Sequence, residues 1–180
     1  MKRYSFALLM LAGGTILAAS LVHAQAPVAA SAVSPAPRPG PPPVKSTIDF
    51  ATAQKVAVAA RTAAPAADAK VAIAIVDSNG DLVYFERMDG SGAVAASQGK
   101  ARAAMLFGLP TKQVADAMAA GKPLAVTLTK PPQGAQEFMV LQGGLPIIKD
   151  GKVVAAIGVG GSSSPNDEKF AQAGIDALGK

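Results

Sequence analysis

The chain has 180 residues, which is enough for one ordinary domain and leaves little for a second. Apolar residues make up 50% of it and aromatic residues only 4%, so we expect a core of Ala, Val, Ile, Leu and Met. The formal net charge is +5, but the basic residues are scattered singly, which gives no indication of a nucleic-acid surface.

The N-terminus has the three parts of an export signal. A positively charged start is followed by the apolar residues 6–22 and by small residues up to a cleavage point after Ala24. Cleavage two residues later also fits, and a retained membrane anchor is the other interpretation, although Gly13-Gly14 interrupts the apolar stretch. We expect a signal peptide at 1–24 and a periplasmic or secreted protein that is free of the membrane after cleavage.

Cleavage would remove the only histidine, His23, from a chain that has no cysteine. The mature protein would then lack the usual general base, the commonest nitrogen ligand of metals and any thiolate. A zinc site, a Ser-His-Asp triad and a Cys-His pair are therefore not expected, and no residue is assigned a catalytic role. Whether the protein binds another metal stays open.

A linker follows the predicted signal. Residues 25–45 are rich in Ala, Pro and Ser and contain the run PAPRPGPPP at 35–43. This composition favours extended polyproline II and cannot bury much apolar surface. We expect a spacer, with a Pro-rich recognition ligand as the second interpretation, and place the folded domain at 46–180.

Hydrophobic periodicity and turn residues predict the elements of this domain. The first is a helix that Thr47 caps and that ends at about Ala63. In chain order there follow a strand at 70–77, an Asn79-Gly80 turn, a strand at 82–89, a helix at 93–107, a short helix capped by Thr111 and ending at Gly121, a strand at 138–141 in an otherwise uninformative stretch, two strands within 145–161 around Asp150-Gly151, and a last helix at 164–178 capped by Ser164.

Two of these strands, 71–76 and 153–160, are apolar on both faces, which is typical of interior strands in a covered sheet. Strict alternation along the second strand assigns four residues to each face: Val153, Ala155, Ile157 and Val159 to one, and Val154, Ala156, Gly158 and Gly160 to the other. A face of such small residues lets a helix or a flat ligand approach closely. Because hairpins pair their strands antiparallel, the expected fold is α/β of the α+β type, an antiparallel sheet flanked by helices.

Five short motifs occur in one order along the domain: Arg87-Met88-Asp89, SQGKARAA at 97–104, GGLPI at 143–147, DGKVVAAIGVGG at 150–161 and DEKFAQAG at 167–174. Together they resemble the GlcG/HbpS family, also called the haem-degrading domain family, over residues 48–178. The resemblance implies a profilin-like sandwich and a homo-oligomer, and in some members haem binding linked to haem or iron sensing. Two positions depart from the family pattern, which usually has Glu at Gln142 and Thr or Ser at Ala103.

Seven residues are candidates for ligand contact. Tyr84 and Met88 belong to the side-chain types that ligate haem iron, and they share a strand face because they lie four residues apart. Arg87 and Lys100 can meet a ligand carboxylate. Free N–H groups at the start of the last helix, at Ser162, Ser163 and Ser164, favour an anion such as a haem propionate. The structural alternatives are core packing for Met88, a surface position for Lys100 and helix capping for the serines.

These features predict an exported, non-catalytic protein that binds haem or a similar flat carboxylated ligand, in haem or iron handling or sensing. The alternative is an enzyme acting on a small hydroxy acid or on haem, which would have to use Lys, Tyr and carboxylates. If Lys100 meets a haem propionate, Lys100→Ala is expected to weaken binding by roughly 1–3 kcal/mol.

Overall fold

The computed structural model describes residues 47–126 and 137–179. The predicted export signal at 1–24 and the predicted linker at 25–45 lie outside these residues. Among the described residues, no helix is both long enough and apolar enough to cross a membrane.

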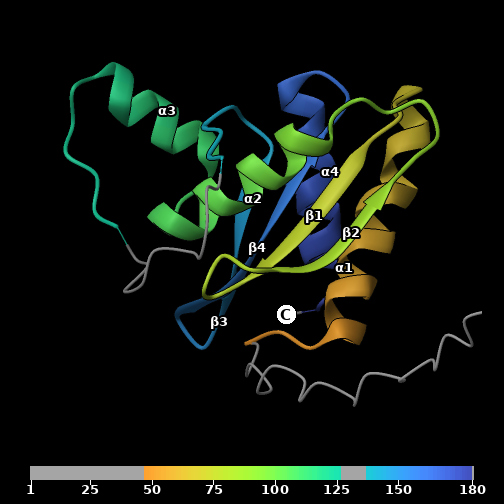
Figure 1. Cartoon of the computed structure of the whole chain (residues 1–180), viewed down its shortest axis with the longest axis horizontal. Helices are drawn as coiled ribbons and strands as arrows, with labels where there is room; N and C mark the ends of the chain where they lie inside the picture. Colours follow the sequence, from red (N-terminus) through yellow and green to blue (C-terminus); the bar gives the residue numbers. More distant parts are fainter. Residues whose placement is uncertain (1–46, 127–136, 180) are drawn as a thin grey trace, which may run out of the picture. The chain divides into compact units, whose positions relative to one another are not determined.

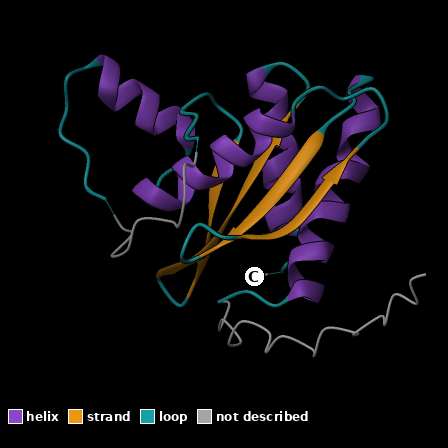
Figure 2. Ribbon diagram, viewed as in Figure 1, coloured by secondary structure: helices purple, strands orange, loops and turns teal. Residues whose placement is uncertain are grey.

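A four-stranded antiparallel sheet forms the centre of the domain (Figures 1 and 2). Across the sheet its strands are β2 (Leu82–Arg87), β1 (Ala72–Asp77), β4 (Lys152–Gly160) and β3 (Gly144–Lys149). Antiparallel hairpins join β1 to β2 and β3 to β4, at the two turns that the sequence predicts. The α+β prediction is confirmed, and the two strands that are apolar on both faces, β1 and β4, are the interior strands.

Helices cover both faces of this sheet. The elements are α1 (Phe50–Ala63), the short 3-10 helix η1 (Ala64–Ala67), α2 (Val94–Phe107), α3 (Thr111–Ala119) and α4 (Ser164–Asp176). Helices α1 and α4 pack on one face over the larger core, and α2 crosses the other face over a smaller core (Figure 1). Apart from Phe170, the fully enclosed residues of both cores are aliphatic or Met, as the low aromatic content predicts.

Small residues bring α2 close to the sheet. Ala74, Gly158 and Gly144 are neighbours across β1, β4 and β3. A Cβ added to Gly158 would lie 2.0 Å from the carbonyl oxygen of Ser97 and 2.4 Å from the backbone nitrogen of Ala101. The backbone of α2 therefore covers the small-residue face. Of the two expected occupants of this face, a helix and a flat ligand, the helix is the one that occupies it.

Strand β4 contains a bulge that the sequence pattern does not reveal. Ile147 of β3 pairs with Ala155, but the next residue, Ile148, pairs with Val153, so Val154 is the extra residue. Val153 consequently packs on the α2 side of the sheet, and Val154 packs on the α1 and α4 side. The faces predicted for these two valines were wrong, because a bulge reverses the alternation on one side of it.

The predicted cap of α1, Thr47, is also wrong. The N-cap is Asp49, whose carboxylate accepts a hydrogen bond from the backbone N–H of Thr52 at 2.7 Å. Thr47 instead ties the chain to the sheet before the helix begins. Its hydroxyl donates to the carbonyl of Val154 and accepts from the backbone N–H of Ser78 at 3.0 Å.

Two predictions around α3 fail for a related reason. Thr111 does not cap the helix but is its first residue, and its hydroxyl donates to the carbonyl of Leu141 at 2.7 Å and accepts from the N–H of Gly144 at 2.9 Å. No strand forms at 138–141, where the N–H of Met139 donates to a carbonyl of α2 at 3.0 Å. This segment gives its backbone groups to helices rather than to the sheet.

Candidate functional site

A buried ion pair links α2 to α4 at one end of the sheet. The ammonium of Lys100 donates to the carboxylate of Asp167, with an Nζ–Oδ2 distance of 2.7 Å, and to the carbonyl of Val159 at 2.9 Å. Both side chains of the pair are only 3% exposed. Lys100 is therefore not a surface lysine, which was the structural alternative for it, and its ammonium is engaged by groups of the chain itself.

Asp167 also closes the turn before α4. Its other oxygen accepts a hydrogen bond from the backbone N–H of Ser162 at 3.0 Å. Burial raises the pKa of Asp167 above its ordinary value, and the hydrogen bond from Lys100 opposes this rise. Ser163 is the N-cap of α4 without a side-chain capping bond, and Ser164, the predicted cap, is the first helical residue. The chain's own carboxylate thus binds one of the N–H groups that were expected to hold an external anion.

Four of the sequence motifs meet at this ion pair, each through one residue: Lys100, Gly143, Val159 and Asp167. A Cβ added to Gly143 would lie 2.7 Å from the Cβ of Asp167 and 2.9 Å from the ammonium nitrogen of Lys100, so only glycine fits beside the pair. These contacts give the motifs a structural role. The sequence does not reveal the partnership of Lys100 and Asp167, because an acidic residue in the first turn of a helix ordinarily complements the helix dipole.

The two residues that depart from the family pattern are close in sequence to Lys100 and Gly143, and they differ in burial. Ala103 is fully buried in α2, and Gln142 is half-buried just before Gly143. A hydroxyl at Ala103 would need a hydrogen-bond partner in an enclosed position.

The candidates on and just after β2 are two strands away from the serines: Arg87 pairs with Ala72 of β1, and Ala72 pairs with Gly160 of β4. Tyr84 and Met88 both pack against the core on the α1 side, so their predicted shared face is confirmed. The hydroxyl of Tyr84 donates to Glu86 at 3.2 Å, and the sulfur of Met88 accepts from the N–H of Val71 at 3.5 Å. Arg87 is exposed. Among the described residues, no hydrogen bond or ion pair joins these three to Lys100 or to the serines, so the seven candidates do not form one network.

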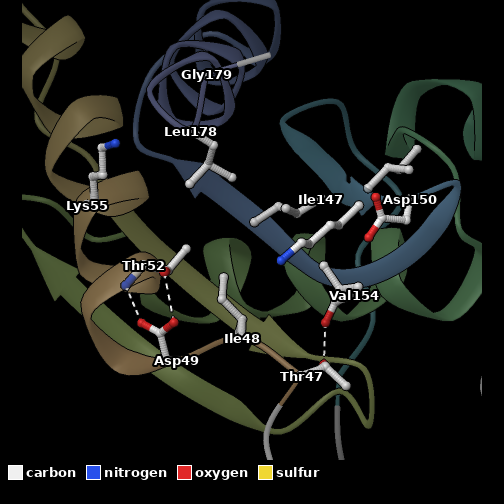
Figure 3. A pocket seen from close by; sticks show the side chains of 12 residues that line it. Thr47, Ile48, Asp49, Thr52, Lys55, Ile147, Asp150, Val154, Leu178 and Gly179 are labelled. Atoms are coloured by element: carbon white, nitrogen blue, oxygen red, sulfur yellow. Dashed lines mark hydrogen bonds between the residues drawn. The ribbon is translucent and has the colours of Figure 1, made fainter.

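A hollow of about 600 Å³ opens beside the β3–β4 hairpin, on the α1 and α4 side of the sheet (Figure 3). Ser162 follows the other end of β4. The walls of the hollow come from three parts of the chain: the start of α1 with the segment that leads into it, the β3–β4 hairpin, and the residues after α4. The lining residues are Thr47, Ile48, Asp49, Thr52, Lys55, Ile147, Ile148, Lys149, Asp150, Val154, Leu178 and Gly179. We call this hollow the hairpin groove. No candidate from the sequence lines it.

Apolar side chains form the floor of the hairpin groove. Ile48 and Ile147 are 6% and 3% exposed, and Leu178 points toward Ile147 across the hollow (Figure 3). Val154 lines the groove because the bulge in β4 turns its side chain to this face. Ile148, at the rim, is 60% exposed, which leaves a large aliphatic side chain open to a ligand.

The charged side chains that line the hairpin groove differ in whether they form hydrogen bonds or ion pairs with other described residues. The carboxylate of Asp49 accepts from both the N–H and the hydroxyl of Thr52, and these hydrogen bonds lower the pKa of Asp49. Lys55 and Lys149 are exposed and have no hydrogen bond or ion pair with any described residue. Asp150 lies at the hairpin turn, across the groove from Lys55 (Figure 3). Two lysines are therefore available to an anionic ligand.

Metal ligands do not gather in the part of the chain that the structure describes: no three His, Cys, Asp or Glu residues lie close enough together to hold an ion.

Comparison with known proteins identifies a family to which the chain is similar over most of its length. The profile of the family described as "Haem degrading protein HbpS-like" matches residues 48–176. The chain is 31% identical, over 136 residues, to an uncharacterized 15.0 kDa protein of Citrobacter freundii encoded between dhaT and dhaS; the alignment covers 74% of this chain and 93% of that protein. It is 36% identical to protein GlcG of Escherichia coli over 91 residues, which are 49% of this chain and 63%, less than two thirds, of GlcG.

Solved structures share the fold. A double mutant of Streptomyces reticuli HbpS is 33% identical to the chain, with a TM-score of 0.64 over 83% of this chain and 99% of that one. A complex of PduOC with haem has a TM-score of 0.63 over 73% of this chain and 95% of that one, and at 23% identity it supports the fold alone.

Proposed function

The chain belongs to the HbpS-like family of haem-degrading proteins, and from this premise we propose that it binds haem or a similar flat, carboxylated ligand without catalysing its conversion. The observation that carries the proposal is the family match across nearly the whole described domain. We further propose a role in haem or iron handling or sensing outside the cytoplasm.

The residues of the domain fit such a ligand if enclosure, rather than iron ligation, provides most of the affinity. A proximal His or Cys normally anchors haem iron, and residues 48–176 contain neither. Burial of a porphyrin's apolar face contributes about 25 cal/mol per Å². The hairpin groove, with its apolar floor, has a volume typical of small-molecule sites. One relative by fold, PduOC, has been crystallised with haem.

Titration of the purified protein with haem should shift and sharpen the Soret band and raise the melting temperature. Tyr84→Phe should leave the visible spectrum unchanged, because the Tyr84 hydroxyl already donates to Glu86 and the ring packs against the core. Absorbance spectra and thermal denaturation provide the measurements. Absence of both effects would refute haem as the ligand, and a porphyrin band that decays with time in the presence of a reductant would favour the enzyme instead.

Export is a second proposal, and it rests on the tripartite N-terminus alone. The mature protein is expected to begin at or near Gln25 and to leave the membrane. N-terminal sequencing of the protein from the extracytoplasmic fraction tests this expectation. Recovery of an intact Met1 in the membrane fraction would contradict it.

We also propose that the protein is a homo-oligomer. Large apolar side chains are exposed on several elements of this small domain, among them Phe50 at 60%, Met118 at 56% and Leu141 at 56%. Association of copies would cover such side chains, and the family resemblance is the main support for a homo-oligomer. Light scattering should show a mass several times that of the chain at micromolar concentration, and a monomeric mass would contradict the proposal.

A further inference from the structure

We infer that the hairpin groove is the ligand site and that Lys55 and Lys149 bind the carboxylates of the ligand. The inference rests on the proposed function and adds to it a location and two residues that determine specificity. It also moves the expected carboxylate contact away from Lys100 and Ser162, which Asp167 already engages.

The first reason is the supply of free cations. In the described residues, ion pairs engage Arg61, Lys100 and Lys112, whereas other lysines such as Lys70, Lys122 and Lys152 form none and lie away from the hollow's lining. Lys55 on α1 and Lys149 on β3 have no such partner, yet both line one hollow. Two ammonium groups beside one hollow can each form a charge-assisted hydrogen bond with a carboxylate of the same ligand.

The second reason is that the acids in the groove compete little for these lysines. The carboxylate of Asp49 is fixed by two hydrogen bonds from Thr52 as the cap of α1. Asp150 lies at the turn on the other side of the groove from Lys55 (Figure 3), and although it follows Lys149 in the chain it forms no ion pair with any described lysine. The groove therefore keeps cationic groups for a ligand.

The third reason is the apolar surface between the charged groups. Ile48 and Ile147 close the bottom of the hollow but are nearly buried, so the aliphatic surface open to a ligand comes mainly from the exposed Ile148 at the rim and from the half-buried Val154 and Leu178. A ligand with an apolar body and carboxylates at its edge matches both features, whereas a small inorganic anion would leave this aliphatic surface in water. The ligand class is thus a carboxylated apolar molecule, with the porphyrins as the representative to test.

The decisive experiment compares haem with its dimethyl ester. The full chain and a Lys55→Ala/Lys149→Ala variant are titrated with both compounds, with absorbance as the readout. We expect the double variant to bind haem at least roughly ten-fold more weakly, because two charge-assisted contacts are lost. The ester lacks the carboxylates, so both proteins should bind it with similar affinity.

Two further variants separate the site from general effects of charge. Lys169→Ala removes an exposed lysine of α4 that does not line the groove, and it should bind haem like the wild type. Ile148→Asp places a negative charge at the exposed rim and should weaken haem binding without loss of folding, which circular dichroism checks.

The outcomes distinguish this inference from the proposed function. If the wild type binds haem and the groove variants bind it equally well, the groove assignment is wrong and the proposed function stands. If the wild type binds neither haem nor metal-free protoporphyrin, the proposed function is wrong and the groove assignment falls with it.

Discussion

Lys100→Met should lower the free energy of unfolding by about 3–5 kcal/mol, the usual loss when one partner of a buried ion pair is removed. Methionine matches the lysine side chain as far as Cε, but without the ammonium it leaves the carboxylate of Asp167 enclosed without its cation. The carbonyl of Val159 loses a donor at the same time. Urea unfolding followed by circular dichroism measures the effect.

A double-mutant cycle tests this explanation. Asp167→Asn alone should also be strongly destabilising, because it strands the ammonium of Lys100. The amide oxygen can still accept from the N–H of Ser162, so Lys100→Met/Asp167→Asn should lose less stability than the sum of the single losses. Lys169→Met, at an exposed lysine, should change stability by about 0.5 kcal/mol or less. Additive losses, or a Lys100→Met variant as stable as the wild type, would show that the pair does not stabilise the fold in this way.

The raised pKa of Asp167 predicts that the stability of the protein depends on pH in the acid range. Because the folded protein holds this proton more tightly than the unfolded chain, the contribution of Asp167 to stability is fully present below its ordinary pKa of 3.8. It declines as the pH rises through the raised pKa of the folded state. Relative to Asp167→Asn, the wild type should therefore lose stability as the pH rises from 3.8 through the raised pKa of the folded state. Above that pKa the difference between the two free energies of unfolding should stay constant.

Gly158→Ala should cost about 3 kcal/mol or more, at or above the upper end of the range for overpacked cores. The added Cβ would meet backbone atoms of Ser97 and Ala101 at 2.0 and 2.4 Å, and a helix backbone cannot move aside as a flexible side chain can. Helix α2 would have to shift away from β4 and loosen the contacts of both Lys100 and Met105. The midpoint of urea unfolding provides the measurement.

Gly92→Ala is the matched control for this substitution. Gly92 lies just before α2, is exposed, has no left-handed backbone conformation, and has no atom within 4 Å of an added Cβ. Alanine there should leave stability unchanged or raise it slightly, since it restricts the unfolded chain. Equal losses at Gly92 and Gly158 would rule out the close approach of α2 as the cause.

The fold was largely predictable because its signals are local. The two hairpin turns and the apolar pattern of β1 and β4 each lie within a few residues of sequence, and the structure has them where they were expected. The failures come from contacts between distant segments. Thr47 and Thr111 looked like helix caps, but their hydroxyls bond to residues more than 25 positions away. The bulge at Val154 depends on pairing with β3 and leaves no mark in β4 alone.

The site was less predictable for the same reason. The partner of Lys100 is 67 residues away in the sequence, so a lysine in an Ala-rich helix gave no hint of an internal carboxylate. The hairpin groove is assembled from the start of α1 with the segment before it, the β3–β4 hairpin and the residues after α4, which only the folded chain brings together. Neither Lys55 nor Lys149 belongs to a motif that the sequence set apart.

The edge contact between Phe50 and Tyr84 has a practical consequence for optical work on this protein. The two rings lie 5.6 Å apart, centroid to centroid, and join the start of α1 to β2. The chain has no tryptophan and two tyrosines, of which Tyr4 falls in the predicted signal peptide. Near-ultraviolet emission of the mature protein would then come from Tyr84 alone. Its fluorescence would report the docking of α1 on the sheet, one contact per molecule, without any engineered label.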